Sequence, residues 1–174
     1  LVEVLQRLHR GLTPADQMAW TDDFAPYLKG SSGQYLYSLK GRGAHQPHLA
    51  AIGQLLHRLV TELAATYAQT PVYQLLVRVF AEHFNLVEAQ AQPKAGTELS
   101  ATSLQSPDDW EASYRWKGDE GHIGYVANAA ETCHSDNPFQ LVVKMQTEPN
   151  STDDATMLAE AVPALKQRTD LDKL

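Results

Sequence analysis

The densest group of chemically capable side chains lies between residues 108 and 120 of the 174-residue chain. Five carboxylates stand there beside two cations and two tryptophans, in the order Asp108, Asp109, Trp110, Glu111, Arg115, Trp116, Lys117, Asp119 and Glu120. Clustered carboxylates can hold two divalent cations about 4 Å apart for phosphodiester chemistry. Such acids must converge from rigid elements distant in sequence, whereas neighbouring acids in a loop more often cap a helix or face water. The sequence therefore favours a structural role over a metal site.

The triplet Arg115, Trp116 and Lys117 places an aromatic ring between two cations. Such cations can contact a nucleic-acid backbone while the ring stacks on a base, so these three residues are the candidate nucleic-acid-binding site. The alternative is a loop that leads into a strand and carries one half-buried tryptophan. The residue pattern favours this loop over the binding site.

The seven histidines and the single cysteine form no recognisable site. His45 and His48 are three residues apart, but a proline lies between them in a glycine-rich segment, so we expect no rigid pair that faces a metal. His57 has no acidic or histidine neighbour four residues away. Cys133 precedes His134, and adjacent strand residues point to opposite faces, so we expect an inert thiol. We assign no catalytic, cofactor-binding or metal-ligating residue.

Apolar residues recur at helical spacing through the first ninety residues. The helices that we expect are 1–12, from Pro14 to about Pro26, from Pro47 to about Leu63, and from Pro71 to about His83. Thr13 and Thr70 each pair a capping side chain with a proline at the first helical position, which is a strong start signal. Between these helices, residues 29–43 predict a loop with one short helix.

The second half of the chain changes its periodicity. Residues 89–107 lack a repeat, and we expect a linker over 91–107. Alternating patterns over 122–129 and 139–147 predict two strands, and the turn formers between them predict an antiparallel hairpin.

A helix over 153–167 should follow, capped by Thr152 and kinked or ended early by Pro163. The expected fold class is therefore α+β: a mostly helical N-terminal half, then a hairpin and a helix.

Composition excludes several classes of protein. The formal net charge of −7 argues against a free-standing module that grips nucleic acid through a basic face. One cysteine excludes an internal disulfide framework and a Cys-rich zinc site. No apolar run approaches the roughly 18 residues that span a bilayer and no signal peptide opens the chain, so we expect a cytoplasmic protein without membrane contact. Both ends fall within element patterns, so we also expect an internal piece of a longer protein.

Several strings resemble DDE-type transposases of bacterial insertion sequences. The matching strings of the second half are residues 104–115 (LQSPDDWEASYR), 124–128 (GYVAN) with 131–133 (ETC), and 149–155 (PNSTDDA). Residues 1–7 (LVEVLQR) and 32–35 (SGQY) resemble the helical region of the same family. The resemblance runs in order over nearly the whole chain.

This resemblance implies a ribonuclease-H-like core that is interrupted by a helical insertion. Residues 1–90 would be the insertion and 108–174 a partial core. Within that core, the second and third strands would be 122–130 and 139–147, followed by the 153–167 helix and the opening of a fourth strand at 171–174. The parent enzyme would cut and rejoin DNA with two magnesium ions held by three carboxylates.

None of the three catalytic positions maps onto this chain. By the resemblance, the first aspartate would precede Leu1, the second would follow Leu174 in an Asp-Gly-Gly-Tyr-like string, and the glutamate would lie later still. Other acids match family strings, but we assign them no catalytic role: Asp108, Asp109, Asp153 and Asp154. The chain by itself should therefore be inactive, with DNA as the partner of its parent.

Two alternatives stay open. A non-catalytic interaction protein could use the helices over 47–83 to bind a partner protein. An enzyme could instead use the segment from Asp108 to Glu120 as a metal site. A partial core would also expose an unpaired sheet edge, so we expect self-association or poor solubility.

Overall fold

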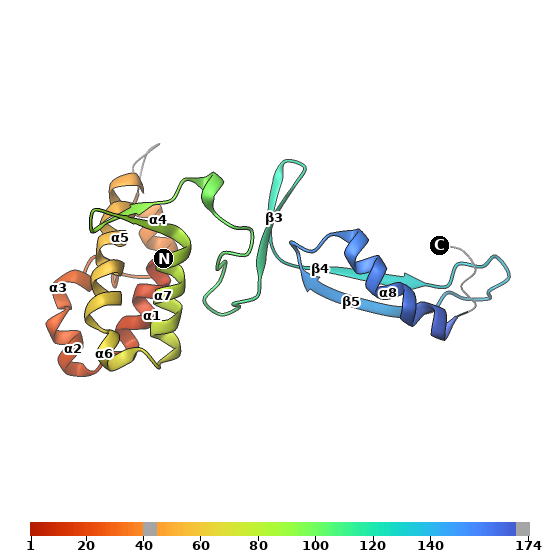
Figure 1. Ribbon diagram of the computed structural model, residues 1–174, viewed down its shortest axis with the longest axis horizontal. Helices are drawn as coiled ribbons and strands as arrows, with labels where there is room; N and C mark the ends of the chain where they lie inside the picture. Colours follow the sequence, from red (N-terminus) through yellow and green to blue (C-terminus); the bar gives the residue numbers. More distant parts are fainter. Residues whose placement is uncertain (40–44, 170–174) are drawn as a thin grey trace. The chain divides into compact units, whose positions relative to one another are not determined.

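The computed structural model describes residues 1–39 and 45–169. It divides into two compact units, Leu1–Ser100 (unit 1) and Ala101–Leu174 (unit 2). The described residues form eight α-helices, one two-stranded sheet and one three-stranded sheet (Figure 1), which confirms the α+β class. None of the helices in these ranges has the length and apolar character that a membrane span requires.

Unit 1 consists mainly of helices, with the bounds α1 (Val2–Gly11), α2 (Pro14–Ala19), α3 (Thr21–Phe24), α4 (Ser32–Ser38), α5 (His45–Glu62), α6 (Ala64–Tyr67) and α7 (Pro71–His83). The starts of α2 and α7 confirm the predicted caps. The Thr13 side chain accepts a hydrogen bond from the Asp16 amide, and the Thr70 side chain accepts one from the Tyr73 amide. These bonds satisfy amides that the first turn leaves without a helical partner. The single helix expected from Pro14 onward is instead two helices, α2 and α3.

The core of unit 1 comes from one face each of α1, α5 and α7. Its fully buried leucines are Leu5, Leu8, Leu56, Leu59 and Leu76. Removing this apolar surface from water is the main stabilising contribution to the unit. The rings of His57, Phe80 and Phe84 add a stack whose successive centroids lie 5.6 Å and 5.8 Å apart. The apolar stripe that the sequence shows on α5 is therefore used inside the unit.

The helix α5 begins two residues before the proline that the sequence predicts as its start. Pro47 is the third residue of α5, where its missing amide hydrogen costs no helical bond. His45 and His48 therefore lie in the first turn of a helix, and the prediction of a loop there is wrong. The Tyr35 hydroxyl lies 2.9 Å from His48 Nδ1, so this ring nitrogen is hydrogen-bonded to a tyrosine of α4.

An unpredicted hairpin follows α7. It consists of β1 (Phe84–Val87) and β2 (Gln90–Pro93), paired antiparallel. The turn residues Glu88 and Ala89 have φ angles of 49° and 62°. Asn-Gly or Asp-Gly pairs are the usual sequence signal for such a turn, and neither stands here. The hairpin is thus hidden from a search for turn residues.

Packing against α5 explains why this hairpin forms. Phe84 and Ala91 are buried beside Gly53, where an added methyl group would come within 2.7 Å of the Phe84 ring. A side chain at position 53 would collide with the Phe84 ring, so the hairpin can pack this closely on α5 only where the helix has glycine. The hairpin and the 3₁₀ turn η1 (Gly96–Glu98) both lie in unit 1, so the linker expected over 91–107 does not begin at residue 91.

Unit 2 holds β3 (Ser113–Lys117), β4 (Glu120–Glu131), β5 (Val142–Pro149) and α8 (Asp154–Arg168). The antiparallel pairing of β4 with β5 confirms the predicted hairpin, although β5 begins at residue 142 instead of 139. β3 occupies residues for which the sequence favours a loop, and it pairs with the first part of β4. The loop prediction is therefore wrong. Hydrogen bonds to residues 120–124, which come later in the chain, stabilise this segment as a strand.

The helix α8 packs against β5. Its buried side chains are Met157, Ala161 and Leu165. The Gln146 side-chain amide of β5 donates a hydrogen bond to the Met157 carbonyl at 3.1 Å. α8 therefore covers one face of the β4–β5 ribbon.

Both ends of α8 differ from the sequence prediction. The cap is Asp153, whose carboxylate accepts a hydrogen bond from the Thr156 amide at 2.9 Å, and not Thr152. Pro163 lies inside the helix, which continues to Arg168 and does not end early. The segment 171–174, expected to open a fourth strand, lies outside the described residues.

Candidate nucleic-acid interface

The three residues of the candidate site lie on β3, in a two-stranded ribbon (Figure 1). β3 pairs with residues 120–124 of β4, whereas β5 pairs with residues 125–131 of the same strand. β4 therefore pairs with a different strand along each of its two edges, and the change of partner from β3 to β5 comes after Gly124. We call residues 113–124 the β arm.

Two glycines shape the β arm. Gly124 has a φ of +122°, a conformation that residues with a Cβ rarely adopt, and it stands where β4 passes from β3 to β5. Gly118 has a φ of +63° and opens the two-residue turn between Lys117 and Glu120. Hairpin turns with glycine at the first central position match the twist of the strands. The backbone of the arm thus depends on glycine at its tip and at its base.

A buried polar network holds the base of the β arm. Ser113 and Asn150 are only 1 % and 5 % exposed. The Ser113 hydroxyl donates to Asn150 Oδ1 at 3.0 Å and accepts from the Ser151 amide at 2.9 Å. Asn150 Nδ2 donates to the His122 carbonyl at 2.8 Å. Because buried polar groups are costly unless they are bonded, this network fixes where the arm leaves the rest of unit 2.

Asp109 holds the loop that precedes the arm. Its Oδ1 accepts hydrogen bonds from the Tyr125 hydroxyl at 2.7 Å and from the amides of Glu111 and Ala112 at 3.1 Å and 3.0 Å. The bond from Tyr125 is the main cause that lowers the pKa of Asp109, and it raises the pKa of Tyr125 to about 12. No group of three or more His, Cys, Asp or Glu side chains in the described ranges could hold a metal ion.

Strand alternation separates the three candidate residues. Arg115 and Lys117 share one face of the β arm with their cross-strand partners His122 and Glu120, whereas Trp116 lies on the opposite face. Trp116 is 63 % exposed and stands on a strand, so the expectation of a half-buried tryptophan in a loop is wrong. The structure brings the two cations together and places the aromatic ring away from them.

The face that carries Trp116 is aromatic and apolar. The Tyr114 ring lies across Gly121, where an added methyl group would come within 2.9 Å of the ring. Ile123 is the direct cross-strand partner of Tyr114, and its side chain is exposed. Rings that cover a strand glycine in this way stabilise the pairing register. This face therefore holds the ribbon together and offers no charge to a phosphate.

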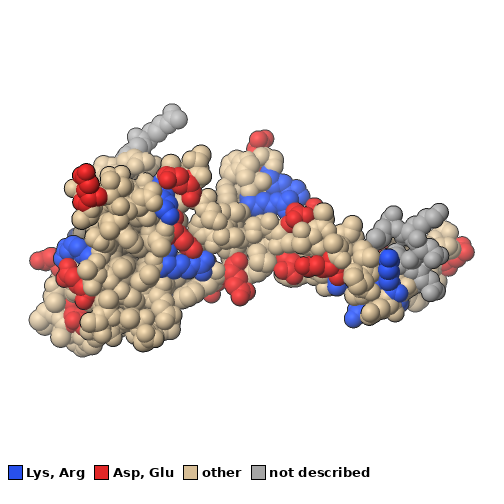
Figure 2. Space-filling model, viewed as in Figure 1, with Lys and Arg blue, Asp and Glu red and all other residues tan. Residues whose placement is uncertain are grey.

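Within residues 1–39 and 45–169, the cations of the β arm have no carboxylate in ion-pair contact. Neither Arg115 nor Lys117 forms an ion pair with any residue that the structure describes. Asp119 and Glu120 stand at the turn of the arm. Figure 2 shows Lys and Arg atoms gathered on the hairpin and Asp and Glu atoms at its tip.

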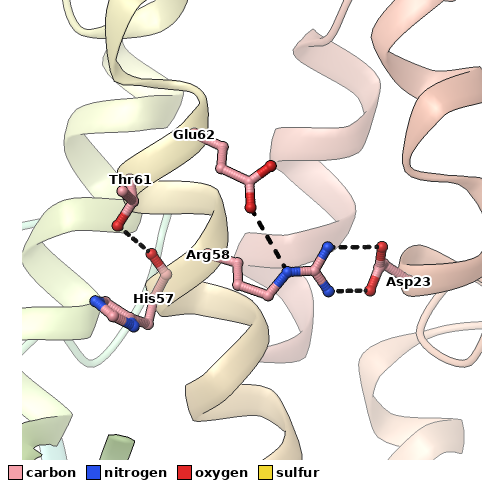
Figure 3. Close-up of polar contacts among 5 residues, drawn as sticks. All are labelled: Asp23, His57, Arg58, Thr61 and Glu62. Carbon is pink, nitrogen blue, oxygen red and sulfur yellow. Dashed lines mark hydrogen bonds and ion pairs between the residues drawn. The ribbon is translucent and has the colours of Figure 1, made fainter. Parts of the chain in front are cut away.

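Arg58 of α5 shows the opposite situation (Figure 3). Its guanidinium Nη1 lies 2.7 Å from Asp23 Oδ1, its Nη2 lies 3.4 Å from Asp23 Oδ2, and its Nε lies 3.7 Å from Glu62 Oε1. The guanidinium carbon also lies 4.8 Å from the centre of the Trp20 ring. This cation is neutralised by two carboxylates, so it offers little attraction to an added phosphate.

Cys133 and His134 lie in the connection between β4 and β5, since β4 ends at Glu131. Neither residue lies in a strand, so the expected separation of their side chains on opposite strand faces is wrong. The thiol of Cys133 is exposed. His134 Nδ1 accepts a hydrogen bond from the Asp136 amide at 3.3 Å, within the turn.

The residues that hold the base of the β arm have no signal in the local sequence, whereas the charged and aromatic residues exposed on its faces do. Ser113 and Asn150 are far apart in sequence, so their pairing has no local signal. The turn does have one: the dipeptide Gly118–Asp119 stands between two short runs that contain aromatic or β-branched residues.

Comparison with protein-family models, with curated proteins and with solved structures finds no match to this chain.

Proposed function

We propose that this chain is part of a DDE-type DNA transposase, in which it contacts DNA without supplying the catalytic carboxylates. The observation that carries the proposal is the order of the elements: a helical unit, an antiparallel β4–β5 ribbon, and a helix packed on that ribbon. The same order is implied by the resemblance of residues 104–115, 124–128 with 131–133, and 149–155 to this family.

The carboxylates of the described residues do not fit a two-magnesium site. Asp109 Oδ1 is engaged by the Tyr125 hydroxyl and two backbone amides, and Asp153 caps α8. We therefore assign no step of phosphodiester cleavage to this chain. The magnesium ions would be held by carboxylates of the parent enzyme, and the part left to this chain is contact with the DNA backbone.

Reading the coding DNA on both sides of the segment tests the proposal. A transposase requires an aspartate-bearing strand upstream and an Asp-Gly-Gly-Tyr-like string downstream, intact or decayed. Absence of both from every reading frame would contradict the proposal.

A second experiment uses the purified chain. We expect no nicking of supercoiled plasmid in the presence of magnesium, because the metal-holding carboxylates are not supplied by this chain. Nicking that persists through purification, and that Asp108→Ala abolishes, would instead favour an enzyme with its own metal site.

The alternative of a helical interaction module depends on a free apolar stripe over residues 47–83. The structure buries that stripe inside unit 1, including Leu55, Leu56, Leu76 and Val79. A partner of such a module would therefore have to contact the exposed residues of these helices, such as Val77.

Self-association belongs to the proposal. In unit 2, the outer edge of β5 has no strand partner among the described residues, and Ile123 and Met145 are exposed. Such an edge is a template for pairing with a second chain. Sedimentation should show oligomers that grow with concentration, and a clean monomer at high concentration would contradict this expectation.

A further inference from the structure

We propose that the β arm binds the backbone of duplex DNA through its cationic face, with Trp116 turned away from the nucleic acid. The inference rests on the proposed function and deepens it, because it names the DNA form and the face that meets it. The charged and titratable residues on that face are Arg115, Lys117, Glu120 and His122.

The β arm separates its cations from its exposed aromatic ring. A protein that binds a single strand stacks its bases on aromatic side chains while a basic groove follows the backbone, so both must line one surface. In the β arm, Trp116 and the two cations lie on opposite faces. A strand whose phosphates meet Arg115 and Lys117 therefore cannot stack its bases on Trp116. Duplex DNA, whose bases are already stacked, needs only the cations.

The cations of the β arm are available to a phosphate. The guanidinium groups of Arg7, Arg58 and Arg78 are each paired with a carboxylate in unit 1. Arg115 and Lys117 have no such pair within the described ranges. Since the whole chain carries a net charge of −7, attraction of a polyanion must come from a local group of cations. On one face of the β arm, the cations Arg115 and Lys117 outnumber the single carboxylate of Glu120, which leaves a local positive excess.

The shape of the β arm also suits duplex DNA. A two-stranded ribbon is one of the elements that the major groove of duplex DNA admits. Isolated two-stranded hairpins are marginally stable in water. The buried pair Ser113 and Asn150 anchors this one at its base, so less conformational freedom is lost when the arm binds.

One residue opposes binding and supplies an internal test. Glu120 lies directly across from Lys117 on the cationic face. Its carboxylate repels a phosphate there, so Glu120→Gln should tighten duplex binding by about two- to fivefold at low salt.

The experiment measures binding of the full 174-residue chain to a fluorescent 25-base-pair duplex and to a 25-nucleotide single strand, across a series of salt concentrations. The duplex should bind more tightly. The double variant R115A/K117A should weaken duplex binding by about 10- to 100-fold at 0.1 M salt. It should also reduce the slope of log K against log salt by about 2, since each phosphate contact contributes about 0.9.

The matched control is K166A/R168A, which removes the same charge from exposed positions at the end of α8. It should change duplex binding by less than about threefold, from the change in net charge alone. Trp116→Ala should leave the affinity for either DNA within about twofold, whereas loss of a stacking contact would cost single-strand binding about five- to 100-fold. Circular dichroism confirms that each variant is folded.

Three results would overturn the inference: equal losses in the two double variants, a large loss of single-strand binding in Trp116→Ala, or no binding of duplex by the wild-type chain. If R115A/K117A fails to fold, the Glu120→Gln variant decides, and unchanged or weaker duplex binding counts against the arm. These outcomes are separate from the proposed function, which the flanking coding DNA tests without reference to the arm.

Discussion

Units 1 and 2 are stabilised by different kinds of contact. Among the described residues, twenty of the twenty-five buried apolar side chains belong to unit 1. All three buried polar residues, Ser103, Ser113 and Asn150, belong to unit 2. Unit 1 is a set of helices that pack through buried leucines. Unit 2 is a pair of ribbons with one helix, and hydrogen bonds and glycines with positive φ angles set the positions of its strands.

This difference shows how a small unit compensates for a thin core. The free energy gained by burying apolar side chains is proportional to the apolar area removed from water. One helix on one face of a ribbon removes little such area. The register and the bend of the ribbons in unit 2 must then be set by directional contacts, such as the Ser113–Asn150 pair. Loss of one such contact should alter local geometry more than global stability.

The largest effect should come from the core of unit 1. Leu56→Ala removes a fully buried side chain of α5, and the lost transfer energy plus the residual cavity should lower the free energy of unfolding by about 3–5 kcal/mol. Urea denaturation followed by circular dichroism measures it. Leu36→Ala is the matched control, since Leu36 is 63 % exposed and its removal should cost less than about 0.5 kcal/mol. Similar losses of unfolding free energy in the two variants would contradict the view that buried apolar side chains stabilise unit 1.

The next effect should come from the backbone of unit 2. Gly124→Ala places a Cβ on a residue with φ +122°, although no atom lies within 4 Å of that position. The expected loss of about 1–3 kcal/mol is therefore conformational and not steric. Hydrogen exchange of the β4 and β5 amides measures local opening. Gly96→Ala, in open space and without a positive φ, should be nearly neutral.

A smaller effect is expected from the surface of unit 1. Arg58→Ala removes the paired contact with Asp23, the contact with Glu62 and the packing on Trp20. Because the Arg58 side chain is half exposed, the free energy of unfolding should fall by only about 1 kcal/mol. The urea midpoint gives the value, with Lys29→Ala as an exposed control. A loss as large as that of Leu56→Ala would mean that polar contacts matter equally in unit 1.

The smallest effect is a titration in unit 2. The hydrogen bond to Asp109 raises the pKa of Tyr125 to about 12, above the ordinary value of 10. The stability from this bond is therefore complete below pH 10 and is lost as the pH rises toward 12. Burial also raises the pKa values of Tyr27 and Tyr35, so tyrosine absorbance at alkaline pH should show several late ionisations, of which that of Tyr125 depends on Asp109.

Asp109→Asn should move the late ionisation of Tyr125 to a lower pH, because the charge that holds the Tyr125 proton is removed. Asp108→Asn, a neighbouring acid, is the control and should leave the titration unchanged. An identical titration in wild type and Asp109→Asn would show that unit 2 does not depend on this contact.

Much of the fold can be predicted from local signals. Thr13 and Thr70 begin helices where the sequence places them, because a cap and its amide are three residues apart. The alternation in β4 and β5 likewise predicts their pairing. The candidate site is predicted only in part: its residues are found, but their arrangement on two faces and the strand that carries them are not.

The hairpin of β1 and β2 shows why some predictions fail. Glu88 and Ala89 adopt left-handed conformations without a local turn signal. Phe84 and Ala91 are buried against the glycine of α5 at position 53, and that tertiary packing accompanies the strained turn. The partner that favours the hairpin lies some thirty residues away, so no window of the sequence around the turn contains it.

By itself, the sequence determined which segments are helical, which pair of strands forms the β4–β5 ribbon, and which residues carry charge, because these properties depend on near neighbours. Only the tertiary structure decided that β4 is divided between two partners at Gly124, that Ser113 meets Asn150, and that Trp116 lies away from the arm cations. The physical reason is that strand pairing joins residues distant in the chain, and a shift of one residue would exchange the faces of every side chain.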